Sequence, residues 1–384
     1  MHRTADRGPL GTLPAPGRDR SSGPEATGHD QAPERERWLA DYLAALEAVM
    51  ARALAPRVSR APVDPATARL WQSLVEATQG GKRFRPALLG EAYLAWGGRD
   101  VAAAASVGAA VELLHTGFVI HDDVIDGDDT RRGRPSVLGA HTKTAQARGI
   151  AADQARAYGI AAAVLAGDLV LTSAVRVVAS TPLEPAVVTR LLDLFDAVLQ
   201  VSAAGELADV WLGVRRAATT ADAALGVAEQ KTAEYSFALP LQAAAVLAGR
   251  SAITVAAAGE VGRCLGTAYQ LVDDLQGVFG ELGVTGKSRL SDLRSGKQTA
   301  LVAHARTTDA WSAIEPYVGL ATITEEQAAE ARKLLSASGS RRHVQRMARG
   351  YVDRAIQLAD GSGVPGHLVS WLAGLGTELL RSVA

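Results

Sequence analysis

Two aspartate-rich stretches lie far apart in this chain and offer carboxylates for a metal ion. The first covers residues 122–126, with the sequence Asp-Asp-Val-Ile-Asp, and the second is Asp273-Asp274. Asp122 and Asp126 are four residues apart, so a helix would place them on one face, about 6 Å apart along its axis. Like charges in this arrangement repel each other, and a bound divalent cation removes the repulsion. Mg²⁺ prefers oxygen ligands and is usually held by one or two carboxylates together with phosphate oxygens.

Basic clusters accompany the acidic stretches. A loop after the first stretch contains Arg131, Arg132 and Arg134, and an upstream segment at residues 81–86 reads Gly-Lys-Arg-Phe-Arg-Pro. Guanidinium groups match phosphate oxygens, and glycine lets the backbone approach a ligand closely. Carboxylates that hold a hard cation attract a phosphate. The combination predicts a site for magnesium and a diphosphate. Taken alone, the first stretch fits equally well a solvated acidic helix end that pairs with Arg131 and Arg132.

Helices are expected to carry these groups. Apolar residues make up 48% of the chain and aromatic residues only 5%, and the apolar content is mostly Ala, Leu and Val, which favours helices. Apolar segments at residues 111–120 and 265–272 lead into the two aspartate stretches. We predict an all-α fold, a single domain of many long helices around a central catalytic cavity that both acidic helices face.

The start of the ordered domain is expected near Trp38. Residues 1–37 are rich in Gly, Pro, Arg, Ser and Asp and lack apolar periodicity, which predicts a disordered tail followed by one domain at 38–384. Thr324 with Gln327 predicts a capping box at the start of a late helix.

Charge and cysteine content restrict the partners and the location. The chain has 40 basic and 41 acidic side chains, a balance that argues against nucleic acid or an anionic membrane as the main partner. The single Cys264 cannot form an internal disulfide, which fits a cytoplasmic location. The apolar run at 160–167 ends at Asp168, short of the roughly 20 residues of a membrane span. We therefore expect no membrane span and no signal peptide.

From about Gly80 to Lys297, the order and spacing of the motifs resemble those of the trans-isoprenyl diphosphate synthases. The matching segments are residues 81–86, Glu-Leu-Leu-His at 112–115, residues 122–126 with Arg131-Arg132-Gly133, Lys231-Thr232, Gln270 with Asp273-Asp274, and Thr285-Gly286-Lys287. The resemblance implies the isoprenoid synthase fold, a homodimer and Mg²⁺ as the cofactor. It also implies a prenyltransferase that condenses isopentenyl diphosphate head-to-tail with dimethylallyl, geranyl or farnesyl diphosphate and releases pyrophosphate.

The same resemblance assigns roles to individual residues. The metal ligands would be Asp122, Asp126 and Asp273, supported by Asp123 and Asp274. The groups that hold the allylic diphosphate would be Arg131, Lys231, Lys287 and Lys297. The groups that hold isopentenyl diphosphate would be Lys82, Arg85, His115 and Arg132. Thr232 and Gln270 would place dipoles near the allylic cation, and the released pyrophosphate would take the proton. The metals would stabilise the leaving pyrophosphate, and a shielded pocket would keep water from the cation.

Three positions depart from the pattern of this family. Gly277 stands where the second motif usually has a third aspartate, which predicts a weakened metal site. Glu206 replaces the glutamine of a Gly-Gln-x-x-Asp segment at residues 205–209, and we interpret it as a paired helix residue without catalytic weight rather than as a new metal ligand. The spacing from Lys287 to Lys297 is one residue longer than is common in this family.

Product length is expected to depend on the residues one turn before Asp122. Gly117 and Phe118 would lie about 6–7.5 Å down that helix. In the family that the chain resembles, large side chains there close the channel for the prenyl tail, and small ones let it pass. The pair is mixed, because Phe118 is bulky and Gly117 has no side chain. We predict geranylgeranyl diphosphate as the product, with farnesyl diphosphate or a longer polyprenyl diphosphate as alternatives.

Two other functions compete with this interpretation. A class I terpene cyclase also uses an aspartate-rich helix and magnesium, but it would lack the basic segment with Lys82 and Arg85, and its second metal motif normally carries Asn, Ser and Glu. A regulatory subunit of a heteromeric synthase often loses catalytic residues, whereas this chain, apart from Gly277, keeps nearly all of them.

Overall fold

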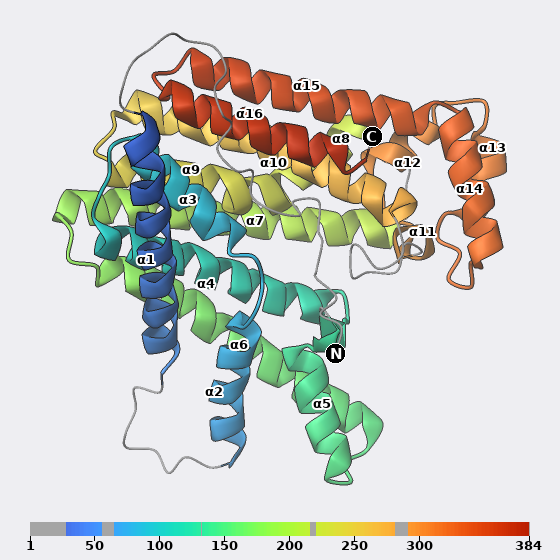
Figure 1. Ribbon diagram of the computed structural model, residues 1–384. Coiled ribbons are helices and arrows are strands. Elements are labelled where there is room, and N and C mark those ends of the chain that lie inside the picture. Colours follow the sequence, from blue (N-terminus) through green and yellow to red (C-terminus); the bar gives the residue numbers. More distant parts are fainter. Residues whose placement is uncertain (1–27, 56–64, 132, 216–219, 281–290, 384) are drawn as a thin grey trace. The chain divides into compact units, whose positions relative to one another are not determined.

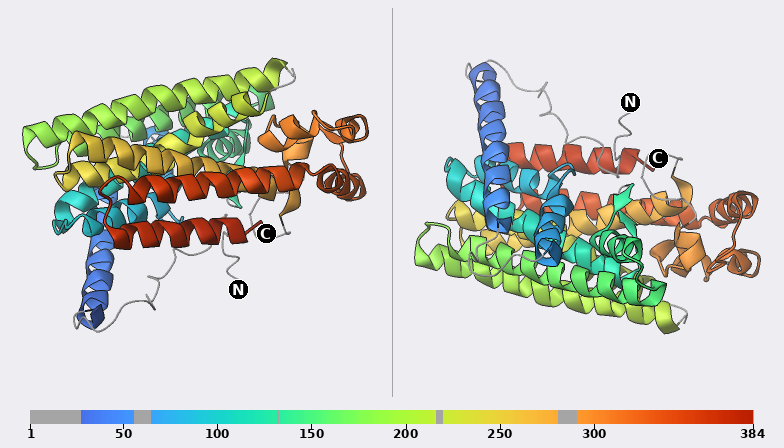
Figure 2. Two further views of the ribbon diagram at one scale, coloured as in Figure 1. Left: turned by 90° about the horizontal axis from the view of Figure 1, so that it is seen from above. Right: turned by 90° about the horizontal axis from the view of Figure 1, so that it is seen from below.

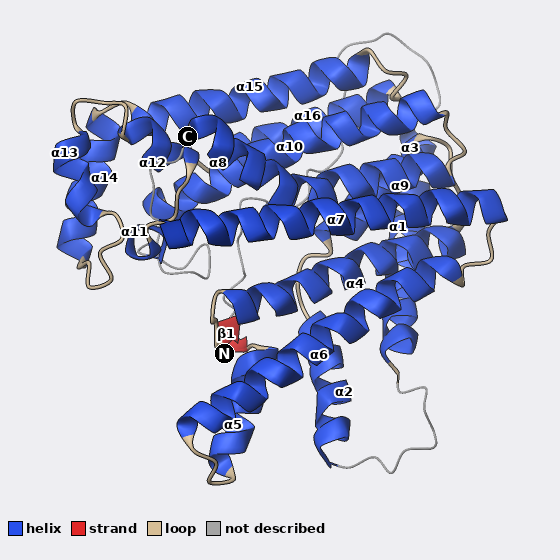
Figure 3. Ribbon diagram, turned by 180° about the vertical axis from the view of Figure 1, so that it is seen from behind, coloured by secondary structure: helices blue, strands red, loops and turns tan. Residues whose placement is uncertain are grey.

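The computed structural model describes residues 28–55, 65–131, 133–215, 220–280 and 291–383 (Figure 1). Nearly all of them are helical. The strands in this part of the chain are β1 (Thr130–Arg131) and β2 (Arg134–Pro135), which form a small antiparallel hairpin (Figure 3). The prediction of an all-α fold is confirmed.

The chain divides into two compact units. The N-terminal unit contains Pro24–Phe195 together with Val246–Gly249, and the described residues of the C-terminal unit belong to Asp196–Ala245 and Arg250–Ala384. The first aspartate motif belongs to the N-terminal unit and the second to the C-terminal unit. The sequence did not predict this division into two units. The central cavity that both acidic helices would face stays a prediction.

The N-terminal unit is built around one long apolar helix, α4, which packs against α1, α3 and α6. Asp100 starts α4, since its Oδ1 accepts a hydrogen bond of 3.0 Å from the backbone N–H of Ala103. The helices are α1 (Gly28–Leu54), α2 (Pro65–Thr78), α3 (Phe84–Ala95), α4 (Val101–Ile125), α5 (Val137–Ala147), α6 (Ala152–Ala179) and the first part of α7 (Pro185–Arg215).

The C-terminal unit is arranged around α10, which packs against the π-helix η1, α12, α15 and α16. The elements after α7 are α8 (Ala221–Ala228), η1 (Glu229–Ala238), α9 (Leu239–Leu247), α10 (Ala252–Phe279), α11 (Ser291–Ser295), α12 (Ala300–Ala305), α13 (Trp311–Ile314), η2 (Glu315–Tyr317), α14 (Glu325–Ala337), α15 (Ser340–Asp360) and α16 (Gly366–Arg381). Figure 2 shows α15 beside α16, in agreement with their contacts. The capping box of Thr324 and Gln327 is present at the start of α14.

Order begins earlier than the sequence predicted. Helix α1 starts at Gly28, so residues 28–37 are helical and do not belong to a disordered tail. Arg35 helps to hold this turn, because its Nε donates a hydrogen bond of 3.1 Å to Glu91 Oε2 on α3. Residues 1–27 lie outside the described part of the chain.

Two described helices, α4 and α6, are long and apolar enough to cross a membrane by length and composition. In α4, 78% of the apolar window is buried, as in the core helix of a folded domain. In α6 the buried share is only 33%. The apolar run that the sequence showed at residues 160–167 ended at Asp168, but helix α6 continues through this residue to Ala179. The exposed large apolar side chains of α6 are Tyr158, Ile160, Val164 and Leu165.

Candidate active site

The first aspartate motif forms the end of α4. Asp122 and Asp123 lie in its last turn, and Asp126 follows as the C-cap residue. The backbone N–H of Asp126 donates to the carbonyl oxygen of Asp122 over 2.8 Å, so the two residues are one helical turn apart, as predicted. Asp123 is buried, Asp122 is half-buried and Asp126 is exposed. The motif therefore presents carboxylates at the surface of the unit.

One guanidinium group lies against both leading carboxylates. Arg131, in strand β1, donates from Nε to Asp123 Oδ1 over 2.7 Å and from Nη2 to Asp122 Oδ2 over 3.0 Å. The hairpin returns Arg131 towards α4, with Gly133 in the turn at a φ of 72°. The pairing of the acidic helix end with Arg131, which the sequence left open, is present. Arg132 lies outside the described residues.

Burial raises the pKa of Asp123 to about 6, because a buried carboxylate loses its hydration. The ion pair and hydrogen bond with Arg131 oppose this effect. The negative charges of Asp122 and Asp128 add to it. Asp122, Asp123 and Asp128 thus place three carboxylates around the guanidinium group of Arg131.

In the upstream basic segment, Arg83 has a structural role. Its Nη1 donates to the buried Glu112 Oε1 over 3.0 Å, and its Nη2 donates to the carbonyl oxygen of Thr78 over 2.7 Å. These bonds tie the start of α3 to α2 and α4. Lys82 and Arg85 flank this anchored residue, with Lys82 exposed and Arg85 half-buried.

The second motif lies in the last third of α10. Asp274 is buried and accepts two hydrogen bonds at Oδ1, from Gln270 Nε2 over 2.9 Å and from Lys297 Nζ over 3.1 Å. The pKa of Lys297 is raised well above its usual value, chiefly by Asp274, while burial opposes the shift. Asp292 and Asp273 also raise it. Lys297 therefore stays positively charged beside the motif.

Thr232 continues this network from η1. Its hydroxyl donates to Gln270 Oε1 over 2.9 Å, so both ends of the Gln270 amide are held and its orientation is set. Close packing makes the contact possible: a Cβ on Gly266 of α10 would lie 2.5 Å from Ala233 Cα of η1. Three residues that the sequence singled out for chemistry, Thr232, Gln270 and Asp274, are thus joined in one chain of hydrogen bonds.

Lys231 points to a different helix. Its Nζ donates to Glu206 Oε1 over 3.0 Å and to Asp209 Oδ2 over 2.9 Å, both on α7. A π-helix of ten residues is rare, and such segments often occur at functional sites. Here η1 directs two consecutive residues, Lys231 and Thr232, towards α7 and α10. The interpretation of Glu206 as a paired helix residue agrees with its ion pair to Lys231.

The sequence pattern of the polyprenyl synthetase family matches residues 67–335. The chain belongs to this family. It is 34% identical over 283 residues to a geranylgeranyl diphosphate synthase of Mycobacterium tuberculosis, covering 73% of this chain and 75% of that protein. It is 33% identical over 293 residues to a (2E,6E)-farnesyl diphosphate synthase of the same organism, covering 74% and 75%.

A solved structure supports the same assignment. The crystal structure of geranylgeranyl pyrophosphate synthase from Corynebacterium glutamicum, complexed with isoprenyl diphosphate and magnesium, has a TM-score of 0.76 and 28% sequence identity, covering 91% of this chain and 98% of that one. This polyprenyl synthetase is therefore a trans-prenyltransferase. The predicted fold and reaction class are confirmed, and the class I terpene cyclase is disfavoured.

In this polyprenyl synthetase, Gly277 is matched by a carboxylate from another element. A Cβ on Gly277 would overlap Oδ2 of Asp292 and would lie 2.7 Å from its Cγ. The carboxylate of Asp292, on α11, therefore occupies the space that a side chain at position 277 would take. Sequence reasoning missed Asp292. The available signal was the departure at Gly277, which calls for a search among carboxylates elsewhere in the chain.

The two chain-length candidates of the synthase have different surroundings. Gly117 is buried, and a Cβ there would lie 2.6 Å from Leu171 Cδ2 of α6. The glycine thus serves the close packing of α4 on α6, and Leu171 fills the space beside it. Phe118 is half-buried. The prediction about product length therefore depends on Phe118.

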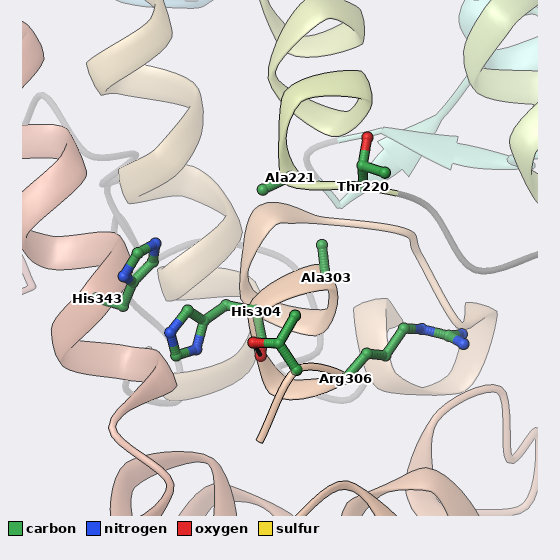
Figure 4. A pocket seen from close by; sticks show the side chains of 7 residues that line it. Thr220, Ala221, Ala303, His304, Arg306 and His343 are labelled. Atoms are coloured by element: carbon green, nitrogen blue, oxygen red, sulfur yellow. Dashed lines mark hydrogen bonds between the residues drawn. The ribbon is translucent and has the colours of Figure 1, made fainter.

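The C-terminal unit of the synthase also has a cavity of about 320 Å³ away from the predicted chemistry (Figure 4). Its lining includes His304, His343 and Arg306, and the two imidazole rings stack with centroids 4.0 Å apart. Burial lowers the pKa of both histidines. A second cavity of about 340 Å³ in the N-terminal unit is lined by Gly80, Gly81 and other residues of that unit.

Lys287, which the sequence predicted to hold the allylic diphosphate, lies outside the described residues.

Proposed function

We propose that this trans-prenyltransferase makes geranylgeranyl diphosphate from isopentenyl diphosphate and a shorter allylic diphosphate, with Mg²⁺ as the cofactor. The observation that carries the proposal is the repeated pairing of adjacent aspartates with a cation. Asp122 and Asp123 lie against Arg131 in the N-terminal unit. Asp274, next to Asp273, lies against Lys297 in the C-terminal unit.

The donor groups fit magnesium. They are carboxylate oxygens, which this hard cation prefers, and the excess negative charge around Asp123 would be relieved by a cation. We propose Asp122, Asp126 and Asp273 as the metal ligands, with Asp292 in place of the third carboxylate of the second motif. The overlap of its carboxylate with the side-chain space of Gly277 supports this addition. When bound, the metal supplies Lewis-acid stabilisation of the leaving diphosphate.

The remaining roles follow from charge and position. The side chains proposed for the allylic diphosphate are Arg131, Lys231, Lys287 and Lys297. The side chains proposed for isopentenyl diphosphate are Lys82, Arg85, His115 and Arg132. The fixed amide of Gln270 and the hydroxyl of Thr232 would set dipoles near the allylic cation without offering a strong base, so the pyrophosphate would take the proton.

A homodimer in the cytoplasm is part of the proposal. Tyr158 and Leu165 are exposed and seven residues apart on α6, so they lie on one side of this helix, and a second copy of the chain would cover them there. Burial of such a face releases free energy in proportion to the apolar area removed from water. Sedimentation velocity tests this part, and a Leu165→Glu variant should dissociate to monomers while the parent stays dimeric.

One assay tests the enzymatic proposal. The purified full chain is incubated with Mg²⁺, isopentenyl diphosphate and, in separate reactions, dimethylallyl, geranyl or farnesyl diphosphate. We expect chromatography to show a twenty-carbon product. A fifteen-carbon or longer main product would overturn the chain-length assignment. A hydrocarbon formed from geranylgeranyl diphosphate alone would indicate a cyclase, and an inert protein would indicate a regulatory subunit.

A further inference from the structure

Lys231 lies between two carboxylates of the same helix. Glu206 and Asp209 are three residues apart on α7, and each accepts a hydrogen bond from Lys231 Nζ, over 3.0 Å and 2.9 Å. All three side chains are about a quarter exposed, at 26%, 21% and 29% for Lys231, Glu206 and Asp209. The group is thus accessible to a ligand and is only partly screened by water.

The backbone brings the group together. Gly205 precedes Glu206, and a Cβ at Gly205 would lie 2.8 Å from the backbone nitrogen of Lys231. Any larger residue would push α7 away from η1. Residues three apart on a helix share one face, so Glu206 and Asp209 reach the same ammonium group. The ion pairs of Lys231 with Glu206 and Asp209 therefore depend on the close packing of α7 against η1.

The charges of this group do not balance. One ammonium faces two carboxylates, so the three side chains carry a net negative charge. A glutamine at position 206, as in the motif that this segment resembles, would accept the same hydrogen bond without the second negative charge. The substitution of a carboxylate for an amide therefore changes electrostatics at Lys231 and leaves size and hydrogen bonding nearly unchanged.

We propose that Glu206 competes with the substrate diphosphate for Lys231 and weakens the enzyme's hold on diphosphates. This inference rests on the proposed role of Lys231 in binding the allylic diphosphate. The anion must displace or share an ammonium that Glu206 already engages, and it meets the repulsion of the Glu206 carboxylate. A weaker hold also speeds the departure of pyrophosphate and prenyl diphosphate, a step that limits turnover in many enzymes.

The test replaces the carboxylate by its isosteric amide. Isothermal titration of Glu206→Gln with inorganic pyrophosphate, at fixed Mg²⁺, should show a dissociation constant about fivefold to tenfold lower than that of the parent. The KM for the allylic diphosphate should fall in parallel. Asp196→Asn is the matched control, since Asp196 is an exposed carboxylate about 15 Å along α7 from Glu206 and binds Gln200. Its dissociation constant should match that of the parent.

A Lys231→Met variant separates the two proposals. If Lys231→Met leaves pyrophosphate affinity unchanged, Lys231 does not bind the diphosphate and the proposed role of Lys231 fails. If Lys231→Met weakens binding but Glu206→Gln has unchanged or weaker affinity, only the competition fails, and Glu206 instead positions Lys231. Glu206→Gln should give a smaller gain in the Lys231→Met background than in the parent, because only the repulsion from the Glu206 carboxylate is then relieved and there is no ammonium left to compete for. Circular dichroism melts of each variant check that the fold is retained.

Discussion

The two aspartate motifs reach a similar arrangement by different routes. In each motif the second aspartate is buried, at 4% exposure for Asp123 and 6% for Asp274, and it accepts hydrogen bonds from a basic side chain. The first aspartate of each pair is more exposed. Burial and pairing suit the second aspartate to positioning, whereas the first is better placed to meet a ligand at the surface of its unit.

The two motifs differ in the sequence separation between each aspartate and its partners. Arg131 follows Asp122 and Asp123 by nine and eight residues and lies in the short hairpin directly after α4. The partners of Asp274 are Gln270 on the same helix and Lys297, 23 residues later, and the neighbour of Gly277 is Asp292 on α11. The first motif is thus a local structure, and the second is assembled from separate elements. We therefore expect an assembled motif to tolerate the loss of one carboxylate where another element places a carboxylate in the same space, as Asp292 does beside Gly277.

The largest effects are expected where a proposed metal ligand is removed. Asp122→Ala and Asp126→Ala should each lower kcat by roughly a thousandfold or more, because the leaving diphosphate loses its metal. Asp273→Ala should be nearly as severe, even though the second motif is assembled from several elements. Steady-state kinetics over a Mg²⁺ titration measures all three. Near-normal turnover in Asp122→Ala would refute the assignment of the first motif.

Restoring the usual aspartate of the second motif should damage this protein. In Gly277→Asp the new side chain would overlap the carboxylate of Asp292, so we expect kcat to fall about tenfold to a hundredfold, the size of effect seen when groups around a metal are displaced.

The matched control is the exchange variant Gly277→Asp/Asp292→Gly, which removes the overlap and returns one carboxylate to the same space. It should recover most of the lost activity and Mg²⁺ affinity, and Asp292→Gly alone should not. Equal losses in the single and the double variant would show that Asp292 does not replace the missing carboxylate.

Features that depend on a few neighbouring residues could be predicted from the sequence. Contacts between separate elements could not. The helices before both aspartate stretches and the capping box at Thr324 follow from periodicity and spacing within a few residues. The sequence also singled out Thr232 and Gln270 individually. It did not reveal that Asp292 lies beside Gly277, or that Arg83 donates a hydrogen bond to Glu112. These contacts depend on how closely helices approach, and that distance is set by packing across segments that a single sequence does not relate.

Product length tests the residue one turn before each motif. Phe118 precedes Asp122 by four residues, and Tyr269 precedes Asp273 by four residues. Phe118→Ala should lengthen the main product by one or more isoprene units, because the channel for the tail is deepened. Tyr269→Ala is the matched control: Tyr269 packs on Phe237, with ring centroids 5.5 Å apart, and its loss should lower the melting temperature without changing product length. Product chromatography decides between them, and an unchanged distribution in Phe118→Ala would exclude Phe118 as the floor.

The smallest expected effect is a change in the pH dependence of stability from the buried aspartate of the local motif. The pKa of Asp123 is about 6 in the folded protein, above the value of about 3.9 for an unfolded aspartate, so folding favours the protonated form. This contribution to stability is fully present below about pH 4 and is lost as the pH rises through 6. Without added metal, the parent should therefore lose about 1 kcal/mol more of its free energy of unfolding between pH 5 and pH 7 than Asp123→Asn does. Urea titrations at the two pH values measure the difference. If both proteins lost the same free energy of unfolding between pH 5 and pH 7, Arg131 would keep Asp123 charged throughout this range. The ion pair between Arg131 and Asp123 would then stabilise the first motif, and burial of the Asp123 carboxylate would not destabilise it.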